Sequence, residues 1–420
     1  MKITLKTGAA LMMLSTVLCA ASLATATPAL VLHETTPVPE EFVAIDKLVQ
    51  KGITDDVYPG AVLVIGRHDD ILFSKCYGRQ TYETTAPLVD FNTYFDMASV
   101  TKVMGPTMAT MKLYENGKLK PSDLVTKYLP EYGVNGKENT TIEHLITHTS
   151  GLIPYLVHKE ITKIVDAGTS KGLTASQSLL NHYCNLKPTA KPGTSFKYSC
   201  LNMQTMAAID EKICGESLEN YLRATVWGDA GLNATTYHLS PEAVAHTMPT
   251  VGDLKTSAVT RVGIVHDPLA AAYISKKHCS GNAGVFSTGN DVARFCQMVA
   301  NKGKVGDKQV LKEKTVLEMT ELRTSEPLAT RTWGWGVYDS PKTSTPLNNT
   351  DGNRCVGHTG YTGTLVWIDM RSGTYVVLLT NRVFPDDRNQ PAGHLSVGKV
   401  RTACINTALK TVEEYKKFFK

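Results

Sequence analysis

Runs of apolar residues near both ends of the chain predict strands. In the stretch AVLVIGRHDDILFSKCYG (61–78), two apolar runs stand on either side of the turn-forming pair Asp69-Asp70, which predicts a β-hairpin. Further short strands are predicted within 332–339, 354–370 and 374–383. Strands at both ends of the chain suggest that the two ends meet in one sheet.

Between these strands, apolar residues recur with the spacing of helices that bury one face. Examples are 101–117, 141–148 and 217–227, which Pro- and Gly-containing loops separate. More helices are predicted at 288–303, 312–321 and 397–419. We therefore expect an α/β fold of the α+β type, with a central antiparallel sheet flanked by helices and an all-helical unit inserted at about 104–280. Residues 27–57, which include a Pro-rich stretch, are assigned no element.

The first 26 residues have the pattern of a secretory signal peptide. Lys2 and Lys6 precede an apolar run, and small residues follow at Ala24-Thr25-Ala26, so we expect cleavage after Ala26. An uncleaved membrane anchor is the alternative, because the apolar run reaches the lower limit of a spanning length. The processing pattern favours export to the periplasm or the medium, without a stable membrane anchor.

Composition and charge exclude some classes of partner. The chain has 420 residues, of which 42% are hydrophobic and 20% charged, so it can bury a large core. Its formal net charge of +5 becomes +3 without Lys2 and Lys6, and no long basic run is present. Nucleic acid is therefore not an expected partner.

Cysteine usage leaves two alternatives open. Of nine cysteines, Cys19 belongs to the leader, and the other eight could form disulfides in an exported protein or remain buried thiols. No C-x-x-C pair indicates zinc.

Candidate chemistry begins with the segment Ser99-Val-Thr-Lys102. Residues three apart share one face of a helix, so the lysine amine could reach the serine hydroxyl. A serine hydroxyl is a weak nucleophile at neutral pH, and a nearby amine is one way to activate it. The same spacing recurs at Ser396 and Lys399, where surrounding charges are typical of a solvent-exposed helix face, so that pair is interpreted as structural.

Five segments together resemble the serine beta-lactamase and penicillin-binding protein superfamily, in particular its class C, D-Ala carboxypeptidase and esterase branch. They occur in the order of that family, and they are FDMASVTKV, LITHTSGL, KPGTSFKYSCLN, GNAGVFSTGNDVARF and GHTGYTGT. The resemblance extends over about 58–382. It implies that 58–420 form one hydrolase domain, which acts through an acyl-serine intermediate and needs no cofactor.

The resemblance implies catalytic roles for three residues. Ser99 would be the nucleophile, with Lys102 as its amine partner, and Tyr198 would act with the lysine as general base and then as acid toward the leaving group. The bare Y-x-N pattern of the family also fits Tyr114 and Tyr183. Tyr114 lies in a predicted helix and Tyr183 precedes the Pro-Gly turn that introduces the family's tyrosine, so we retain Tyr198.

The sequence departs from the family two positions after this tyrosine. Many members carry Asn there, whereas this chain has Cys200, and Asn202 follows two residues later. Since a thiol donates hydrogen bonds only weakly, either Asn202 contacts the acyl amide of the substrate or recognition differs. The change argues against penicillin-like substrates more than against acyl transfer.

The family's strand triad, Lys-Thr-Gly in many members and His-Thr-Gly in others, corresponds to His358-Thr359-Gly360. His358 would hydrogen-bond Tyr198 or hold a substrate carboxylate. The glycines of this segment would let a substrate backbone lie along the strand edge, against Thr359 and Gly360. The backbone N–H groups of Ser99 and Tyr361 would form the oxyanion hole.

Two other patterns are assigned to structure. His144 and His148 have the four-residue spacing of a zinc-binding helix, but they fall within or next to a family segment and no third ligand is apparent, so no metal is expected. Met104, Met108 and Met111 are expected to pack in the core.

The expected function is therefore that of an exported serine hydrolase with a small-molecule or peptide substrate, such as a peptidoglycan stem peptide. A D-alanyl-D-alanine carboxypeptidase or esterase activity is the first expectation, and beta-lactamase activity is the alternative. A non-catalytic protein that binds cell-wall peptide is the alternative from another class, because a fold does not fix a function.

Overall fold

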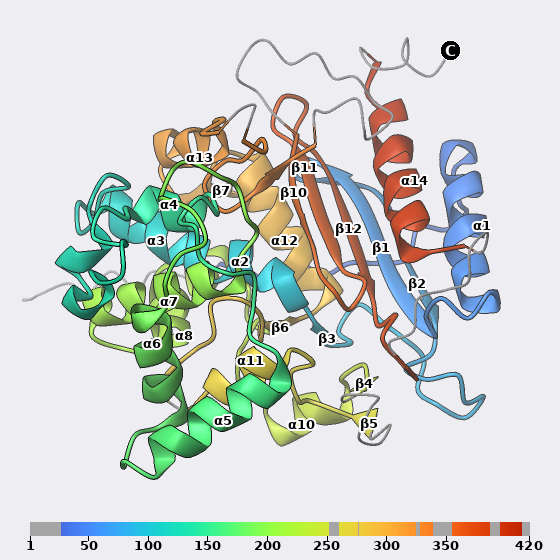
Figure 1. Cartoon of the computed structure of the whole chain (residues 1–420). Coiled ribbons are helices and arrows are strands. Elements are labelled where there is room, and N and C mark those ends of the chain that lie inside the picture. Colours follow the sequence, from blue (N-terminus) through green and yellow to red (C-terminus); the bar gives the residue numbers. More distant parts are fainter. Residues whose placement is uncertain are drawn as a thin grey trace, which may run out of the picture.

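A six-stranded antiparallel sheet forms the centre of the molecule (Figure 1). The computed structural model describes residues 27–251, 260–275, 277–324, 328–338, 355–386 and 395–413. The strand order is β2-β1-β12-β11-β10-β9. The strands are β1 (Gly60–Arg67), β2 (Asp70–Gly78), β9 (Gly336–Val337), β10 (Cys355–Thr359), β11 (Leu365–Asp369) and β12 (Thr374–Thr380).

The two ends of the chain meet in this sheet, as predicted. The hairpin β1–β2 is followed in space by β12, which pairs with β1 in antiparallel register, Leu63 opposite Leu378. The predicted fold class is therefore confirmed. The strand predicted within 332–339 is reduced to the two residues of β9, which pair with Val356 and Gly357 of β10.

The inner strands are buried on both faces. In β1, Val62 and Val64 belong to the core on one side of the sheet, whereas Leu63 and Ile65 belong to the core on the other. A strand that is covered on both sides has a continuous apolar run instead of an alternating one. This is why the apolar run in β1 is unbroken.

Helices cover both faces of the sheet. Helices α1 (Glu40–Thr54) and α14 (Val397–Lys410) lie on one face, and α12 (Gly289–Ala300) lies on the other, as Figure 1 shows. Helix α1 was not predicted from the sequence. The helical spacing of its buried residues is present in Phe42, Ile45 and Val49. The prolines before it are typical of irregular chain, but Pro39, immediately before the helix, is instead a start signal.

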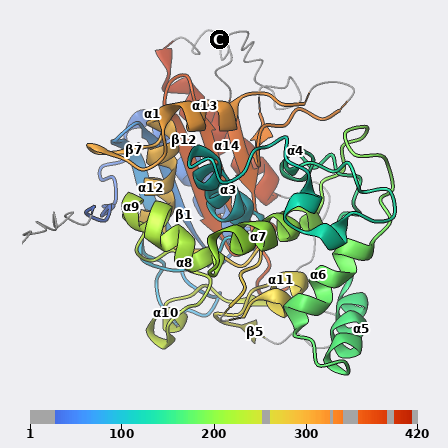
Figure 2. The same cartoon turned by 90° about the vertical axis from the view of Figure 1, so that its left-hand side faces the viewer.

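A large helical unit lies beyond α12 (Figure 2). Its helices are α2 (Thr101–Met104), α3 (Pro106–Glu115), α4 (Ile142–Ile146), α5 (His158–Thr169), α6 (Ala175–Asn185), α7 (Cys200–Cys214), α8 (Leu218–Leu222), α9 (Gly228–Ala230), α10 (Pro241–Ala245) and α11 (Pro268–Tyr273). Helix α13 (Glu313–Thr320) follows α12 along the chain. Short strand pairs join β3 (Phe95–Asp96) to β6 (Phe286–Ser287), β4 (Thr250–Val251) to β5 (Thr260–Arg261), and β7 (Lys304–Val305) to β8 (Lys308–Gln309).

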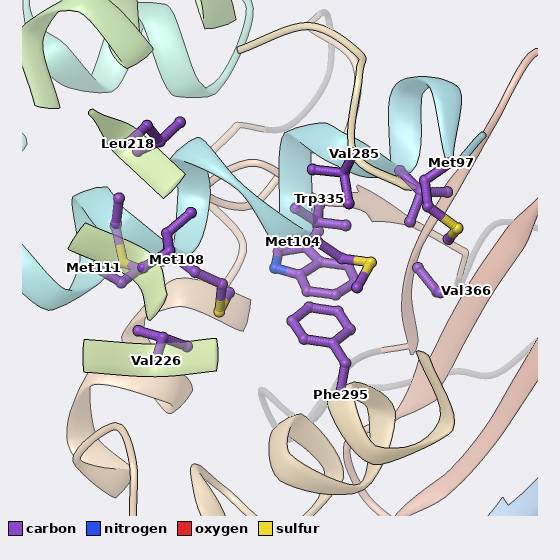
Figure 3. Packing of buried hydrophobic residues seen from close by; sticks show 14 of the residues in the cluster. Met97, Met104, Met108, Met111, Leu218, Val226, Val285, Phe295, Trp335 and Val366 are labelled. Atoms are coloured by element: carbon purple, nitrogen blue, oxygen red, sulfur yellow. The ribbon is translucent and has the colours of Figure 1, made fainter. Parts of the chain in front are cut away.

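The core between the sheet and the helical unit is rich in methionine. Met104, Met108 and Met111 are fully buried. Met104 lies beside the stacked rings of Phe295 and Trp335, whereas Met108 and Met111 lie nearer to Val226 and Leu218 (Figure 3). Methionine is flexible and fills irregular gaps, so it suits the junction of a sheet and short helices. The expectation that these methionines pack in the core is confirmed.

The structure favours the thiol alternative over disulfides, because no disulfide joins any two of the eight cysteines in the described residues. Within the same residues, no helix is both long and apolar enough to cross a membrane. The predicted leader, including Cys19, and the last residues of the predicted helix 397–419 lie outside the described residues.

Candidate active site

A sharp turn presents Ser99 between β3 and α2. Ser99 lies in a single 3-10 turn (Ala98–Val100), and the preceding Ala98 has a φ of +46°. This left-handed conformation costs a residue with a Cβ roughly 1–2 kcal/mol. The buried carboxylate of Asp96 stabilises it, because it accepts the N–H groups of Ala98 at 2.8 Å and of His266 at 2.7 Å.

The structure brings Ser99 and Lys102 together. The fully buried Lys102 donates from Nζ to Ser99 Oγ at 3.0 Å and to the carbonyl oxygen of Asn282 at 2.8 Å. Gln204 in turn holds the side chain of Asn282, at 2.8 Å. Asn282 lies in one of the five family segments, but the sequence predicted no role for it.

The ionisation of Lys102 depends on its neighbours. Burial opposes the ammonium form, whereas Cys200 and Tyr198, when anionic, favour it, and the balance raises the pKa of Lys102 above its ordinary value. The two hydrogen-bond acceptors, Ser99 Oγ and the Asn282 carbonyl oxygen, thus fit the ammonium form of Lys102.

Tyr198 is the tyrosine at this site. Lys102 Nζ lies 5.0 Å from the centroid of its ring. The two rivals have other places: Tyr114 OH donates to Glu318 at 2.9 Å, and Tyr183 is fully buried and does not line the cavity described below. The choice of Tyr198 over both rivals thus fits the geometry.

His358 stands beside Tyr198 as a neutral side chain. The two ring centroids are 6.0 Å apart. Nδ1 lies 2.9 Å from the Thr359 carbonyl oxygen, which can only accept, so Nδ1 carries the proton and Nε2 is left as an acceptor. Burial, together with the charges of Lys102 and Arg331, holds the pKa of His358 well below its usual range. Nε2 is buried and has no hydrogen-bond partner among the described residues, so the expected bond to Tyr198 is not formed in this structure, and a neutral imidazole is also a weak ligand for a substrate carboxylate.

Cys200 and Asn202 point to opposite sides of α7. Successive residues of an α-helix are turned by about 100°, so residues two apart face nearly opposite directions. Cys200 Sγ lies 3.8 Å from Lys102 Nζ, and burial raises the pKa of this thiol. Asn202 is fully buried and accepts from Ser150 Oγ at 2.6 Å. This geometry contradicts the expectation that Asn202 takes over the substrate contact.

The β10–β11 turn (360–364) lies against the segment that precedes Ser99. Thr362 Oγ1 donates to the carbonyl oxygen of Asp96 at 2.7 Å, and Thr364 Oγ1 donates to that of Met97 at 3.0 Å. A Cβ on Gly360 would lie 2.6 Å from the Met97 carbonyl oxygen, so this contact requires glycine. Gly360 therefore permits close packing of the chain, and it also lines the cavity described below, so its expected place beside a substrate stays a prediction.

A cavity of about 350 Å³ opens at Ser99. Three arginines reach it, and no Asp or Glu is among the described residues that line it. None of the arginines was identified from the sequence, because they follow no recognisable spacing and come from separate elements. The lining residues are Ser99, Tyr198, Arg331, Gly336, Tyr338, Gly357, His358, Thr359, Gly360, Tyr361, Arg382 and Arg401.

The remaining candidate residues have structural contacts. His144 Nδ1 accepts the N–H of Thr141 at 3.2 Å, and His148 Nδ1 accepts that of Ser199 at 3.3 Å. Within the described ranges, no group of three or more His, Cys, Asp or Glu could hold a metal ion. Ser396 caps α14 by accepting the backbone N–H of Lys399, so its hydroxyl is used in the way that a structural interpretation predicts.

Comparison with known proteins agrees with this geometry. The family model described as Beta-lactamase matches residues 45–398. The chain belongs to the beta-lactamase family. It is thus a serine hydrolase of the beta-lactamase fold, and the resemblance identified from the sequence is confirmed.

Members and structural neighbours of this family have several activities. A Salmonella agona protein with the provisional name D-alanyl-D-alanine carboxypeptidase is 28% identical over 367 residues, which cover 80% of this chain and 82% of the relative. EstCE1, a hydrolase with promiscuous acyltransferase activity, superimposes with a TM-score of 0.66 at 22% identity, over 87% of this chain and 97% of its own. A class C beta-lactamase superimposes with a TM-score of 0.68 at 16% identity, over 91% and 99%. These likenesses define the fold and leave the substrate open.

Proposed function

We propose that the protein is an exported hydrolase that forms an acyl-enzyme on Ser99 and acts as a D-alanyl-D-alanine carboxypeptidase or esterase on substrates that carry a carboxylate. The observation that carries the proposal is the 3.0 Å contact between Ser99 Oγ and Lys102 Nζ at a cavity of about 350 Å³. Export is supported by the pattern of the first 26 residues. Peptidoglycan stem peptides have the required carboxylate and are a candidate substrate.

The proposed mechanism assigns the proton transfers to Tyr198. Because Lys102 is an ammonium group, it cannot accept the Ser99 proton; instead it stabilises a Tyr198 phenolate, which can. Ser99 Oγ then attacks the substrate carbonyl, and the backbone N–H groups of Ser99 and Tyr361 stabilise the oxyanion. Tyr198 returns the proton to the leaving group, and water hydrolyses the acyl-enzyme.

The charge of the cavity supports an anionic substrate. Arg331, Arg382 and Arg401 contribute positive charge, and no carboxylate among the described lining residues opposes it. A site lined with one sign of charge raises the local concentration of substrates of the opposite sign. The expected signature is a KM that rises with salt for a carboxylate-bearing ester and changes much less for a neutral ester of the same acid.

Beta-lactamase activity is the second candidate, favoured by the fold shared with a class C enzyme. Cys200 argues against it, because a weakly donating thiol stands where many members of the family carry Asn. Parallel assays with a chromogenic cephalosporin, a peptide ending in D-Ala-D-Ala and a nitrophenyl ester will rank the three activities.

The proposal is tested by covalent labelling. The wild-type protein and two serine variants are treated with a fluorophosphonate probe and with a fluorescent penicillin. Fluorophosphonate should label the wild type and Ser396→Ala, which removes the other S-x-x-K serine, but not Ser99→Ala. The absence of label on all three proteins, with no turnover in the assays above, would instead support a non-catalytic binding protein. For export, the mass of the secreted protein should correspond to cleavage after Ala26.

A further inference from the structure

The turn 360–364 receives three hydrogen bonds from one arginine of the last described helix. Arg401, on α14, donates from Nη2 to the carbonyl oxygens of Gly360 at 2.5 Å and Thr364 at 2.9 Å. Its Nε donates to the carbonyl oxygen of Gly363 at 3.3 Å. A guanidinium group offers its donors in a fixed planar arrangement, so these bonds fix the orientation of the peptide groups that they reach.

One of these bonds acts on the peptide unit that contains the Tyr361 N–H. The carbonyl of Gly360 and the N–H of Tyr361 belong to the same planar peptide group, and in a trans peptide the two point in opposite directions. The Gly360 carbonyl oxygen accepts from Arg401 and also from the backbone N–H of Gly363 at 3.1 Å, and because Arg401 draws it toward α14, the Tyr361 N–H points away from α14. The positive charge of the Arg401 guanidinium, next to the carbonyl oxygen, also polarises the peptide group and makes its N–H a stronger donor.

We infer that Arg401 is a positioning residue of the oxyanion hole, which orients the Tyr361 N–H through the Gly360 carbonyl. The inference rests on the proposed function, which gives this N–H its role. It assigns to α14 a part in the reaction, although Arg401 follows Ser99 by most of the length of the domain. The sequence predicted a helix at 397–419 but no part for this helix in catalysis.

A second arginine provides a comparison. Arg382 Nε donates to the carbonyl oxygen of Tyr361 at 2.7 Å, and its guanidinium lies 4.4 Å from the centroid of the Tyr361 ring. These contacts hold the next peptide group and the side chain, but not the peptide that contains the Tyr361 N–H. Arg382→Gln should therefore reduce kcat less than Arg401→Gln does.

The test separates orientation of the peptide from binding of a substrate carboxylate. On a neutral nitrophenyl ester, Arg401→Gln should lower kcat by about tenfold to a hundredfold, somewhat less than the loss of an oxyanion donor itself, with KM nearly unchanged. Arg401→Lys should recover part of the lost kcat. Lys399→Gln, a change two residues earlier on α14, should have the kcat of the wild type. An unchanged kcat on the neutral ester, with a raised KM confined to carboxylate-bearing substrates, would show that Arg401 binds substrate and would overturn the inference.

Hydrogen–deuterium exchange gives a readout that does not depend on activity. Amides of the 360–364 turn should exchange faster in Arg401→Gln than in the wild type, and Arg401→Lys should lie between them. If kcat falls while exchange in the turn is unchanged, the inference is wrong. If the wild type neither turns over substrate nor takes up fluorophosphonate, the proposed function fails and the inference falls with it, whatever the exchange shows.

Discussion

The Lys102 ammonium donates to the Ser99 hydroxyl at 3.0 Å from a position that is fully buried. A buried charge is stable only when it is paired or hydrogen-bonded. Here the second acceptor, the Asn282 carbonyl, lies far along the chain, so the folded helical unit is needed to hold the lysine in place. The reactivity of Ser99 therefore depends on this arrangement and on the groups around it.

Replacing the buried lysine should abolish most acylation. Lys102→Met keeps the length of the side chain but removes the charge that stabilises the Tyr198 phenolate. We expect the rate of fluorophosphonate labelling to fall by at least about a hundredfold. Lys399→Met, the same change in the second S-x-x-K pair, serves as the control and should label at the wild-type rate. A Lys102→Met rate within threefold of the wild type would remove the lysine from the mechanism.

The two tyrosines should differ sharply. Tyr198→Phe removes the proposed base and should lower turnover by at least about a hundredfold. Tyr183→Phe should hardly change turnover, because Tyr183 is buried away from the cavity. Steady-state kinetics on a nitrophenyl ester measure both variants. The reverse order of effects would show that the family's tyrosine has been assigned to the wrong residue.

Position 200 should control the preference between amide and ester substrates. Cys200→Asn introduces the strong amide donor that many family members carry. One hydrogen bond contributes about 0.5–1.5 kcal/mol, so the ratio of cephalosporin turnover to ester turnover should rise by roughly twofold to tenfold. Cys200→Ser, with a smaller hydroxyl, is the matched control and should change the ratio less. If Cys200→Asn leaves the ratio unchanged, the thiol does not determine the substrate preference.

Two buried histidines should make the fold sensitive to acid. Burial holds the pKa of His148 and His358 well below 6.5, so below that pH the unfolded chain binds protons that the folded chain does not. Acidification from pH 6.5 toward pH 5 therefore lowers the free energy of unfolding, by up to about 1.4 kcal/mol per pH unit for each histidine.

The measurement is the slope of unfolding free energy against pH from urea titrations. His148→Asn keeps an acceptor for the Ser199 N–H but cannot take up a proton, so its slope should be smaller than that of the wild type. His238 and His278 contribute in the opposite sense, since hydrogen bonds to glutamates raise their pKa. Comparison of variant and wild type cancels that contribution. Equal slopes would show that His148 can be protonated in the folded protein.

Much of the fold followed from local pattern. The hairpin 61–78 and the helices at 288–303 and 312–321 were predicted because apolar spacing and turn residues act over a few neighbouring positions. The proximity of Ser99 to Lys102 was predictable for the same reason, since a helical turn brings residues three apart together. Helix α1 was missed only because the prolines before it were not read as a start signal.

The sequence alone determined the strands and helices whose apolar spacing is clear. It also determined the beta-lactamase family and the pairing of Ser99 with Lys102. The tertiary structure alone decided that Asn202 is buried against Ser150, that the Asn282 carbonyl accepts from Lys102, and that Arg401 donates to the turn 360–364. The reason is physical: residues close in sequence are related by the geometry of one helix or strand. Residues far apart in the sequence meet only when elements from different parts of the chain pack together. Local spacing along the sequence does not predict which of their side chains then come into contact.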